Sequence, residues 1–148
     1  MAAAEMRPDK RILVVDDDDA IRALLRTVLR RRGFGVDAAR NGIEALEQMV
    51  ASRYALVVLD LMMPRMSGYE LLEHLGRQSI MTRPRVLVLT AGLEPRDFDT
   101  ELVVGTVHKP FDVDLLVDIV TACLDAAPAA QPPAAPEELA LPPESRPN

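Results

Sequence analysis

Polar side chains that could act together stand at the ends of short apolar runs. Residues 12–15, 55–59 and 86–89 are wholly apolar, and each run stops at a carboxylate or hydroxyl residue. Buried parallel strands read as apolar runs, and ligands bind beyond their carboxyl ends. The polar residues at these ends, and after a fifth run, are Asp16, Asp17, Asp60, Thr90 and Lys109. The sequence therefore predicts that these five side chains share one edge of a sheet.

This set of groups predicts phosphoryl chemistry with a metal ion. Crowded carboxylates repel one another unless a cation joins them, and oxygen ligands with room for water suit Mg²⁺. Asp16, Asp17 and Asp60 are therefore candidate metal ligands. Lys109 offers a positive charge and Thr90 a hydroxyl donor for phosphoryl oxygens. A carboxylate can also be the nucleophile that forms an aspartyl phosphate, and Asp60 is the candidate.

The elements that must position these groups alternate between strand and helix. Apolar runs predict strands near residues 12–15, 35–39, 55–59, 85–89 and 102–107. Apolar periodicity predicts helices near residues 20–32, 43–52, 68–78, 95–102 and 112–126. This alternation predicts an α/β domain with a doubly wound five-stranded parallel sheet of flavodoxin-like order 2-1-3-4-5 and helices on both faces.

Details of the helices follow from residue type and spacing. Asp19 is interpreted as the N-cap of the first helix and Asn41 as that of the second. One face of the first helix carries arginines and is interpreted as solvated: Arg22, Arg26 and Arg30. The inward stripe of the last helix is predicted to contain Leu115, Leu116, Ile119, Val120 and Cys123.

Composition bounds the class of protein. The 148 residues include 17 Lys+Arg and 23 Asp+Glu, a net charge of −6 that argues against nucleic-acid binding. No apolar stretch reaches membrane-spanning length and no apolar signal segment is visible, so we expect a cytoplasmic protein that binds no membrane. We expect an N-terminal extension at residues 1–10, the folded domain at 11–127 and a disordered Pro/Ala-rich tail at 128–148.

Five stretches of the chain resemble the receiver domain of two-component response regulators: ILVVDDDDAIRALLRTVLRRRGF, NGIEAL, YALVVLDLMMPRMSGYELL, RVLVLTA and VHKPF. The resemblance covers residues 11 to about 126. It implies a phosphoacceptor switch that takes its phosphoryl group from a histidine kinase or a phosphotransfer protein. Output would pass through a downstream protein. Beyond its own phosphorylation and slow autodephosphorylation, such a switch is not an enzyme.

The resemblance also implies a role for each polar residue at the sheet edge. Asp60 would be the phosphorylated residue. The implied Mg²⁺ ligands are Asp17, Asp60 and the backbone carbonyl of Met62, with Asp16 assisting. The implied contacts to the phosphoryl oxygens come from Thr90 and Lys109. The peptide bond between Lys109 and Pro110 is expected to be cis.

Two departures from the family pattern stand between Thr90 and Lys109. Thr106 occupies a position where receivers usually carry an aromatic residue, and the whole segment is shorter than usual by about one helical turn. Both departures fall on the surface that receivers normally use for output. We therefore expect intact phosphorylation chemistry with an altered output surface.

Two other readings of the sequence remain open. A Mg²⁺-dependent phosphatase with an aspartyl nucleophile would usually carry a second Asp two residues after the first, where Met62 stands here. A receiver-like interaction module that needs no phosphate would fit the altered output surface but not the complete set of polar groups. A dinucleotide-binding domain is disfavoured because the Gly-x-Gly-x-x-Gly fingerprint is absent.

Overall fold

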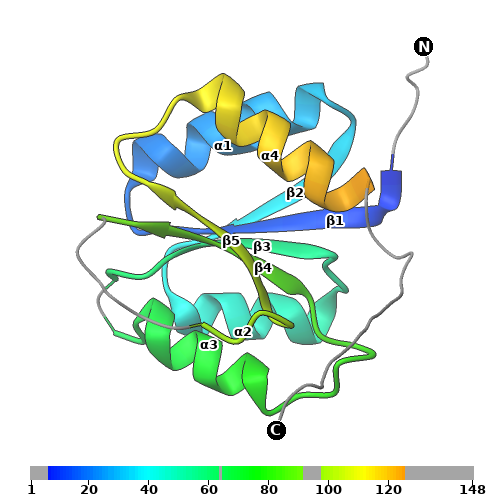
Figure 1. Cartoon of the computed structure of the whole chain (residues 1–148), viewed down its shortest axis with the longest axis vertical. Coiled ribbons are helices and arrows are strands. Elements are labelled where there is room, and N and C mark those ends of the chain that lie inside the picture. Colours follow the sequence, from blue (N-terminus) through cyan, green and yellow to red (C-terminus); the bar gives the residue numbers. More distant parts are fainter. Residues whose placement is uncertain (1–6, 64, 92–97, 126–148) are drawn as a thin grey trace, which may run out of the picture.

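The structure, a computed structural model, describes residues 7–63, 65–91 and 98–125 (Figure 1). Strands and helices alternate along these residues in the order β1 (Arg7–Val15), α1 (Asp19–Arg31), β2 (Phe34–Ala39), α2 (Gly42–Ala51), β3 (Leu56–Asp60), α3 (Gly68–Gly76), β4 (Arg85–Thr90), β5 (Val103–His108) and α4 (Val113–Asp125). Among the described helices, none combines the length and apolar composition needed to cross a bilayer.

The strands form one parallel sheet in the order β2-β1-β3-β4-β5. Helices α1 and α4 cover one face of the sheet, and α2 and α3 cover the other (Figure 1). This arrangement confirms the predicted doubly wound fold of order 2-1-3-4-5. Because all strands point the same way, their carboxyl ends meet at one edge, on the left in Figure 1.

The central strand β3 is buried at all five positions. Its side chains alternate between the faces, so Val57 packs in the cluster under α2 and α3, while Val58 packs in the cluster under α1 and α4. Burying a side chain of this size stabilises a fold by about 1.5–3 kcal/mol. A strand enclosed on both faces can be apolar throughout, which explains the run that made β3 recognisable in the sequence.

The first strand begins earlier than its apolar run indicated. Arg7 pairs with Phe34 of β2, and the register shifts between Arg7 and Ile12. The predicted N-terminal extension at residues 1–10 therefore overlaps β1, because backbone pairing requires no apolar side chain. Residues 1–6 and the predicted tail at 128–148 lie outside the described residues.

The cap of α1 lies one residue before its predicted position. Asp18 is the N-cap, and its carboxylate accepts hydrogen bonds from the backbone N–H groups of Ala20 (2.9 Å) and Ile21 (3.1 Å). Asp18 has the extended backbone that a cap needs (φ −82°, ψ 114°), whereas Asp19 is already helical. For α2 the prediction is confirmed, since Asn41 accepts from the N–H of Glu44 at 3.0 Å.

The apolar stripe of α4 is rotated relative to its prediction. Leu115 is 57% exposed, so its predicted inward position is wrong. The buried residues are Leu116, Val117, Val120 and Leu124, which follow the helical period of 3.6. Helix α4 carries more apolar residues than one face can bury, and its contact with α1 and the sheet selects which of them are enclosed.

The predicted helix at residues 95–102 is replaced, in its described part, by a turn. The carbonyl of Asp99 accepts hydrogen bonds from the N–H groups of Leu102 (3.0 Å) and Val103 (2.8 Å), and β5 begins directly afterwards. Residues 95–97 lie outside the described residues. The short connection between β4 and β5 thus reaches the edge strand through a single described turn.

Gly68 and Gly76 allow a matched test of how closely α3 approaches β3. A Cβ at Gly68 would lie 2.5 Å from Leu61 Cα and 2.6 Å from the Asp60 carbonyl oxygen, whereas a Cβ at Gly76 meets nothing within 4 Å. We expect Gly68→Ala to lower the free energy of unfolding by about 2 kcal/mol or more, because backbone atoms cannot move aside.

Gly76→Ala is the control, and it should leave stability unchanged or raise it by about 0.5 kcal/mol through reduced chain entropy. Urea unfolding of both variants measures the difference. Equal stabilities for the two variants would contradict the close approach of α3 to the end of β3.

Candidate functional site

The sheet brings the predicted polar residues to its carboxyl edge. Asp60 pairs with Leu89, and Thr90 pairs with His108, so the ends of β3, β4 and β5 are level. Val15, directly before Asp16, pairs with Leu59, directly before Asp60. Residues as distant as Asp16 and Lys109 therefore become neighbours through parallel pairing alone.

Asp16 is the most deeply buried carboxylate of the site. It is fully buried, and Lys109 Nζ donates to its Oδ2 at 3.0 Å while the backbone N–H of Asp18 donates to its Oδ1 at 2.9 Å. A buried charge is costly unless it is paired and hydrogen-bonded. Both oxygens of Asp16 meet that requirement, so its burial depends on Lys109 and on the turn into α1.

Asp60 is only 4% exposed and lies beside the same lysine. Its Oδ1 accepts from the backbone N–H of Met62 at 3.1 Å, and its Oδ2 lies 3.5 Å from Lys109 Nζ. Burial, followed by the negative charge of Asp16, raises the pKa of Asp60 to about 6, against the lowering effects of the Met62 N–H and Lys109. Asp60 is thus a carboxylate at pH 7 and a stronger base than an ordinary aspartate.

Lys109 places one ammonium group between two carboxylates. Burial alone would lower its pKa, but the hydrogen bond to Asp16 and the charges of Asp16 and Asp60 raise it above its ordinary value. Its backbone N–H donates to the carbonyl of Thr90 at 2.8 Å. The peptide bond to Pro110 is cis, which confirms that prediction. Lys109 is therefore charged at neutral pH and anchored to the end of β4.

Asp17 completes a group of three carboxylates. One carboxylate oxygen each from Asp16, Asp17 and Asp60 lies within 4.8 Å of the others. Asp17 is exposed, whereas the other two are buried. Hard oxygen donors with one solvent-facing member suit Mg²⁺, which keeps several of its waters when it binds protein. The side chains that the structure describes at this edge thus fit a magnesium ion.

Met62 and Thr90 also lie where the prediction needs them. Met62 follows β3 in the loop to α3, where its backbone N–H donates to Asp60 and the residue is 60% exposed. Thr90 is buried as the last residue of β4. These positions bring both residues to the carboxyl edge, and their roles toward a metal ion and a phosphoryl group stay predictions.

Arg22 also belongs to this region, and the prediction that it is part of a solvated face is wrong. Its side chain is only 15% exposed. Its Nη1 donates to the backbone carbonyl of Asp16 at 2.8 Å, and its Nη2 pairs with Asp19. The spacing of three residues between Asp19 and Arg22 on one helix is a signal that could have indicated this pair.

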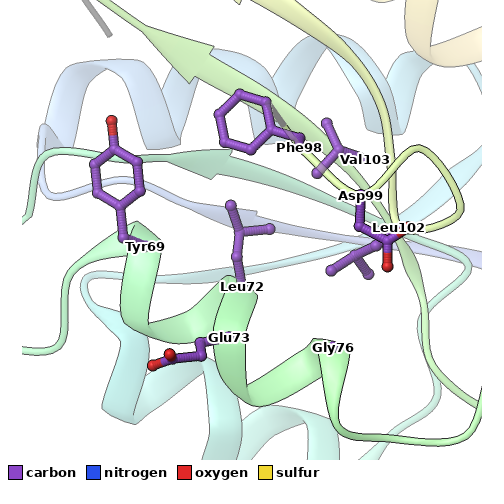
Figure 2. Close-up of a pocket in the computed structure, with 8 residues that line it drawn as sticks. All are labelled: Tyr69, Leu72, Glu73, Gly76, Phe98, Asp99, Leu102 and Val103. Atoms are coloured by element: carbon purple, nitrogen blue, oxygen red, sulfur yellow. The ribbon is translucent and has the colours of Figure 1, made fainter. Parts of the chain in front are cut away.

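A separate hollow lies between α3 and the turn before β5 (Figure 2). Its volume is about 240 Å³, and its walls are mainly apolar, with Tyr69 and Leu72 from α3 facing Phe98. Its two acids, Glu73 and Asp99, lie 3.9 and 3.8 Å from Arg77 and Arg83 respectively. This hollow contains no crowded carboxylates, so the candidate chemistry belongs to the carboxyl edge.

The chain matches the family model of the response regulator receiver domain over residues 12–121. The chain belongs to this family. Response regulator MprA from Mycobacterium ulcerans (strain Agy99) and that from Mycobacterium avium (strain 104) are each 40% identical to it over 121 residues, 77% of this chain and 50% of theirs. This receiver domain chain therefore spans about half the length of the curated relatives it matches.

Solved structures agree with the family assignment. A CheY-like receiver domain protein from Methanospirillum hungatei JF-1 is 28% identical, with a TM-score of 0.70, over 78% of this chain and 94% of that one. The response regulator TrrA from Thermotoga maritima, in complex with Mg(2+)-BeF, is 37% identical with a TM-score of 0.66, over 78% of this chain and 99% of that one. These matches support the same fold for the receiver domain.

The raised pKa of Asp60 predicts a pH-dependent stability. The folded protein keeps the Asp60 proton up to about pH 6, whereas the unfolded chain loses it near the ordinary pKa of 3.8. The free energy of unfolding therefore falls as pH rises between those two values. Asp60→Asn abolishes this pH-dependent loss of stability, because asparagine does not ionise. In metal-free buffer at pH 7.5 we expect the variant to be more stable than the wild type by roughly 1 kcal/mol or more, since a pKa difference of one is worth about 1.4 kcal/mol.

The advantage of Asp60→Asn should shrink toward zero near pH 4, as followed by urea unfolding at several pH values. Glu47→Gln, which replaces an exposed carboxylate on α2, is the control and should show no such trend. If the stability difference between Asp60→Asn and the wild type did not change with pH, the raised pKa of Asp60 would be contradicted.

Proposed function

We propose that this receiver domain accepts a phosphoryl group on Asp60 from the phosphohistidine of a histidine kinase or a phosphotransfer protein. The observation that carries the proposal is the setting of Asp60, a buried carboxylate that lies 3.5 Å from Lys109 Nζ and within 4.8 Å of two other carboxylates. Phosphorylation would then change binding to a downstream protein, so the domain acts as a signalling switch.

The metal in this proposal is Mg²⁺. Asp17, Asp60 and the backbone carbonyl of Met62 would bind it, with Asp16 assisting. When bound, the ion supplies positive charge that offsets the crowded carboxylates and an incoming phosphoryl group. The oxygen donors described above support this assignment, as does the Mg(2+)-BeF complex of TrrA.

Phosphoryl transfer would proceed by direct attack of an Asp60 carboxylate oxygen on the phosphorus of the phosphohistidine. A P–O bond forms while the P–N bond breaks, and the imidazole nitrogen leaves with the bonding electrons and takes up a proton. Asp60 is ionised for this attack above its pKa of about 6. Lys109 Nζ and the Thr90 hydroxyl would donate to the transferred oxygens, so positioning and charge provide the catalysis.

An apolar surface beside Lys109 suits a protein phosphodonor. A hollow of about 430 Å³ joins the start of α1 to the loop after β5, and its lining residues are Ile21, Leu24, Lys109, Pro110, Phe111 and Val113. Leu24 is 42% exposed there. Docking on this surface would place the phosphohistidine of a kinase or phosphotransfer protein next to the lysine and would bury the exposed apolar area.

The other two functions are less well supported. A phosphatase with an aspartyl nucleophile would need an acid two residues after Asp60, and Met62 offers no titratable group. A phosphate-independent interaction module would gain nothing from burying Asp16 and Asp60 around one ammonium, an arrangement that costs stability when both are ionised. Slow loss of phosphate from Asp60 is the only hydrolysis we propose.

Phosphorylation of Asp60 can be tested by intact mass measurement. We expect the wild type to gain one phosphoryl group when incubated with Mg²⁺ and acetyl phosphate, and to gain none in excess EDTA. Asp60→Asn should gain none under either condition, because the amide is not a nucleophile at this position. Asp118→Asn, which removes an exposed carboxylate on α4, is the control and should label normally. Full labelling of Asp60→Asn would refute the assignment.

Magnesium binding can be tested without phosphorylation. We expect Mg²⁺ to raise the melting temperature, because a ligand of the native state at a hundredfold excess over its Kd adds about 2.7 kcal/mol. Asp17→Asn should lose most of this rise. Asp18→Asn is the control, because asparagine caps a helix as well as aspartate does. Equal responses of the two variants to Mg²⁺ would argue against Asp17 as a ligand.

A further inference from the structure

Arg22 joins the two ends of the loop that carries Asp17. Its Nη1 donates to the carbonyl of Asp16 at the end of β1, and its Nη2 pairs with Asp19 at the start of α1. Its backbone N–H donates to the carbonyl of Asp18 at 3.0 Å. One residue therefore contacts three of the four consecutive aspartates, and none of these contacts uses the carboxylates of Asp16 or Asp17.

The carbonyl held by Arg22 belongs to the peptide that links Asp16 to Asp17. Asp16 is fixed in addition by burial and by Lys109, whereas Asp17 is exposed and gains no comparable support from packing. The orientation of that peptide sets the position of the Asp17 Cα and the direction in which the Asp17 side chain leaves the backbone. A planar guanidinium that bonds two oxygens at once can hold a peptide in one orientation, which a flexible ammonium does less well.

We propose that Arg22 is a positioning residue for the magnesium site: it holds the peptide between Asp16 and Asp17 so that the Asp17 carboxylate meets those of Asp16 and Asp60. This inference rests on the proposed function. It is not an obvious assignment, because the guanidinium carries a positive charge close to a cation site. As a charge alone, Arg22 would weaken Mg²⁺ binding. As a positioning residue it strengthens binding, so the sign of the effect separates the two roles.

The test compares the Mg²⁺ affinity of the full chain and two arginine variants. Isothermal titration calorimetry with MgCl₂ gives the Kd, and a melting curve in EDTA reports stability separately. We expect Arg22→Ala to raise the Kd by about tenfold, a typical effect of removing a residue that orients a metal ligand. Arg26→Ala removes the same charge from an exposed position one turn further along α1, and it should change the Kd by less than about twofold.

A second readout separates positioning from general damage. At saturating Mg²⁺, Arg22→Ala should be phosphorylated by acetyl phosphate at close to the wild-type rate, while its half-saturating Mg²⁺ concentration is raised. If Arg22→Ala shows no cooperative unfolding, Arg22→Lys replaces it under the same criterion, since lysine keeps the charge but not the planar fork.

Two results for the Arg22 variant would overturn the inference. One is a Kd for Mg²⁺ in the Arg22 variant that equals or falls below that of the wild type. The other is a phosphorylation rate that stays low at saturating Mg²⁺, which would place Arg22 in phosphoryl transfer itself. A wild-type chain that binds no Mg²⁺ would overturn both this inference and the proposed metal site, whereas unaltered binding in the variant overturns only the role of Arg22.

Discussion

The balance of charge at the carboxyl edge is the constraint on which the structure depends. Asp16 and Asp60 are buried, and a single ammonium, that of Lys109, lies 3.0 and 3.5 Å from their oxygens. With Asp17 included, three carboxylates and one ammonium carry a net charge of minus two when all are ionised. Burial, followed by the negative charge of Asp16, raises the pKa of Asp60 to about 6, so the ionised form of Asp60 is held at a cost in free energy. A divalent cation has the charge that would cancel the net negative charge.

The parallel sheet brings these charged side chains together at one edge. Asp16 and Lys109 are separated by 93 positions, and they meet because β1 and β5 run parallel in one sheet with level ends. The loops beyond the strands add local control: Gly68 lets α3 begin against the end of β3, and Asp18 starts α1 while donating to Asp16. The apolar interior supplies the stability that offsets the cost of gathering like charges at one edge.

Much of this architecture could be predicted because its signals are local. Apolar runs revealed the strands, and helical periodicity with caps such as Asn41 revealed the helices. The errors have other causes. The predictions that Leu115 is buried and that Arg22 is solvated are wrong because each outcome depends on what lies beside α4 or α1. The N-cap of α1 is Asp18 and not Asp19 because Asp18 has the extended backbone that a cap needs. The type of a residue on a helix does not indicate which other elements will cover it. Packing therefore decides which of several similar helix positions are buried.

The sequence by itself determined the fold class, the order of the strands and the residues that reach the carboxyl edge, because strand ends and residue types are properties of the chain. It also indicated the chemistry, since three aspartates, a threonine and a lysine at strand ends admit few functions. Tertiary structure alone decided which carboxylates are buried, that Lys109 lies closer to Asp16 than to Asp60, and that Arg22 turns back onto the Asp16 carbonyl. The Lys109 contacts depend on distances between elements remote in the chain, and the Arg22 contact depends on how β1 turns into α1. The burial of each charge arises only when the elements pack.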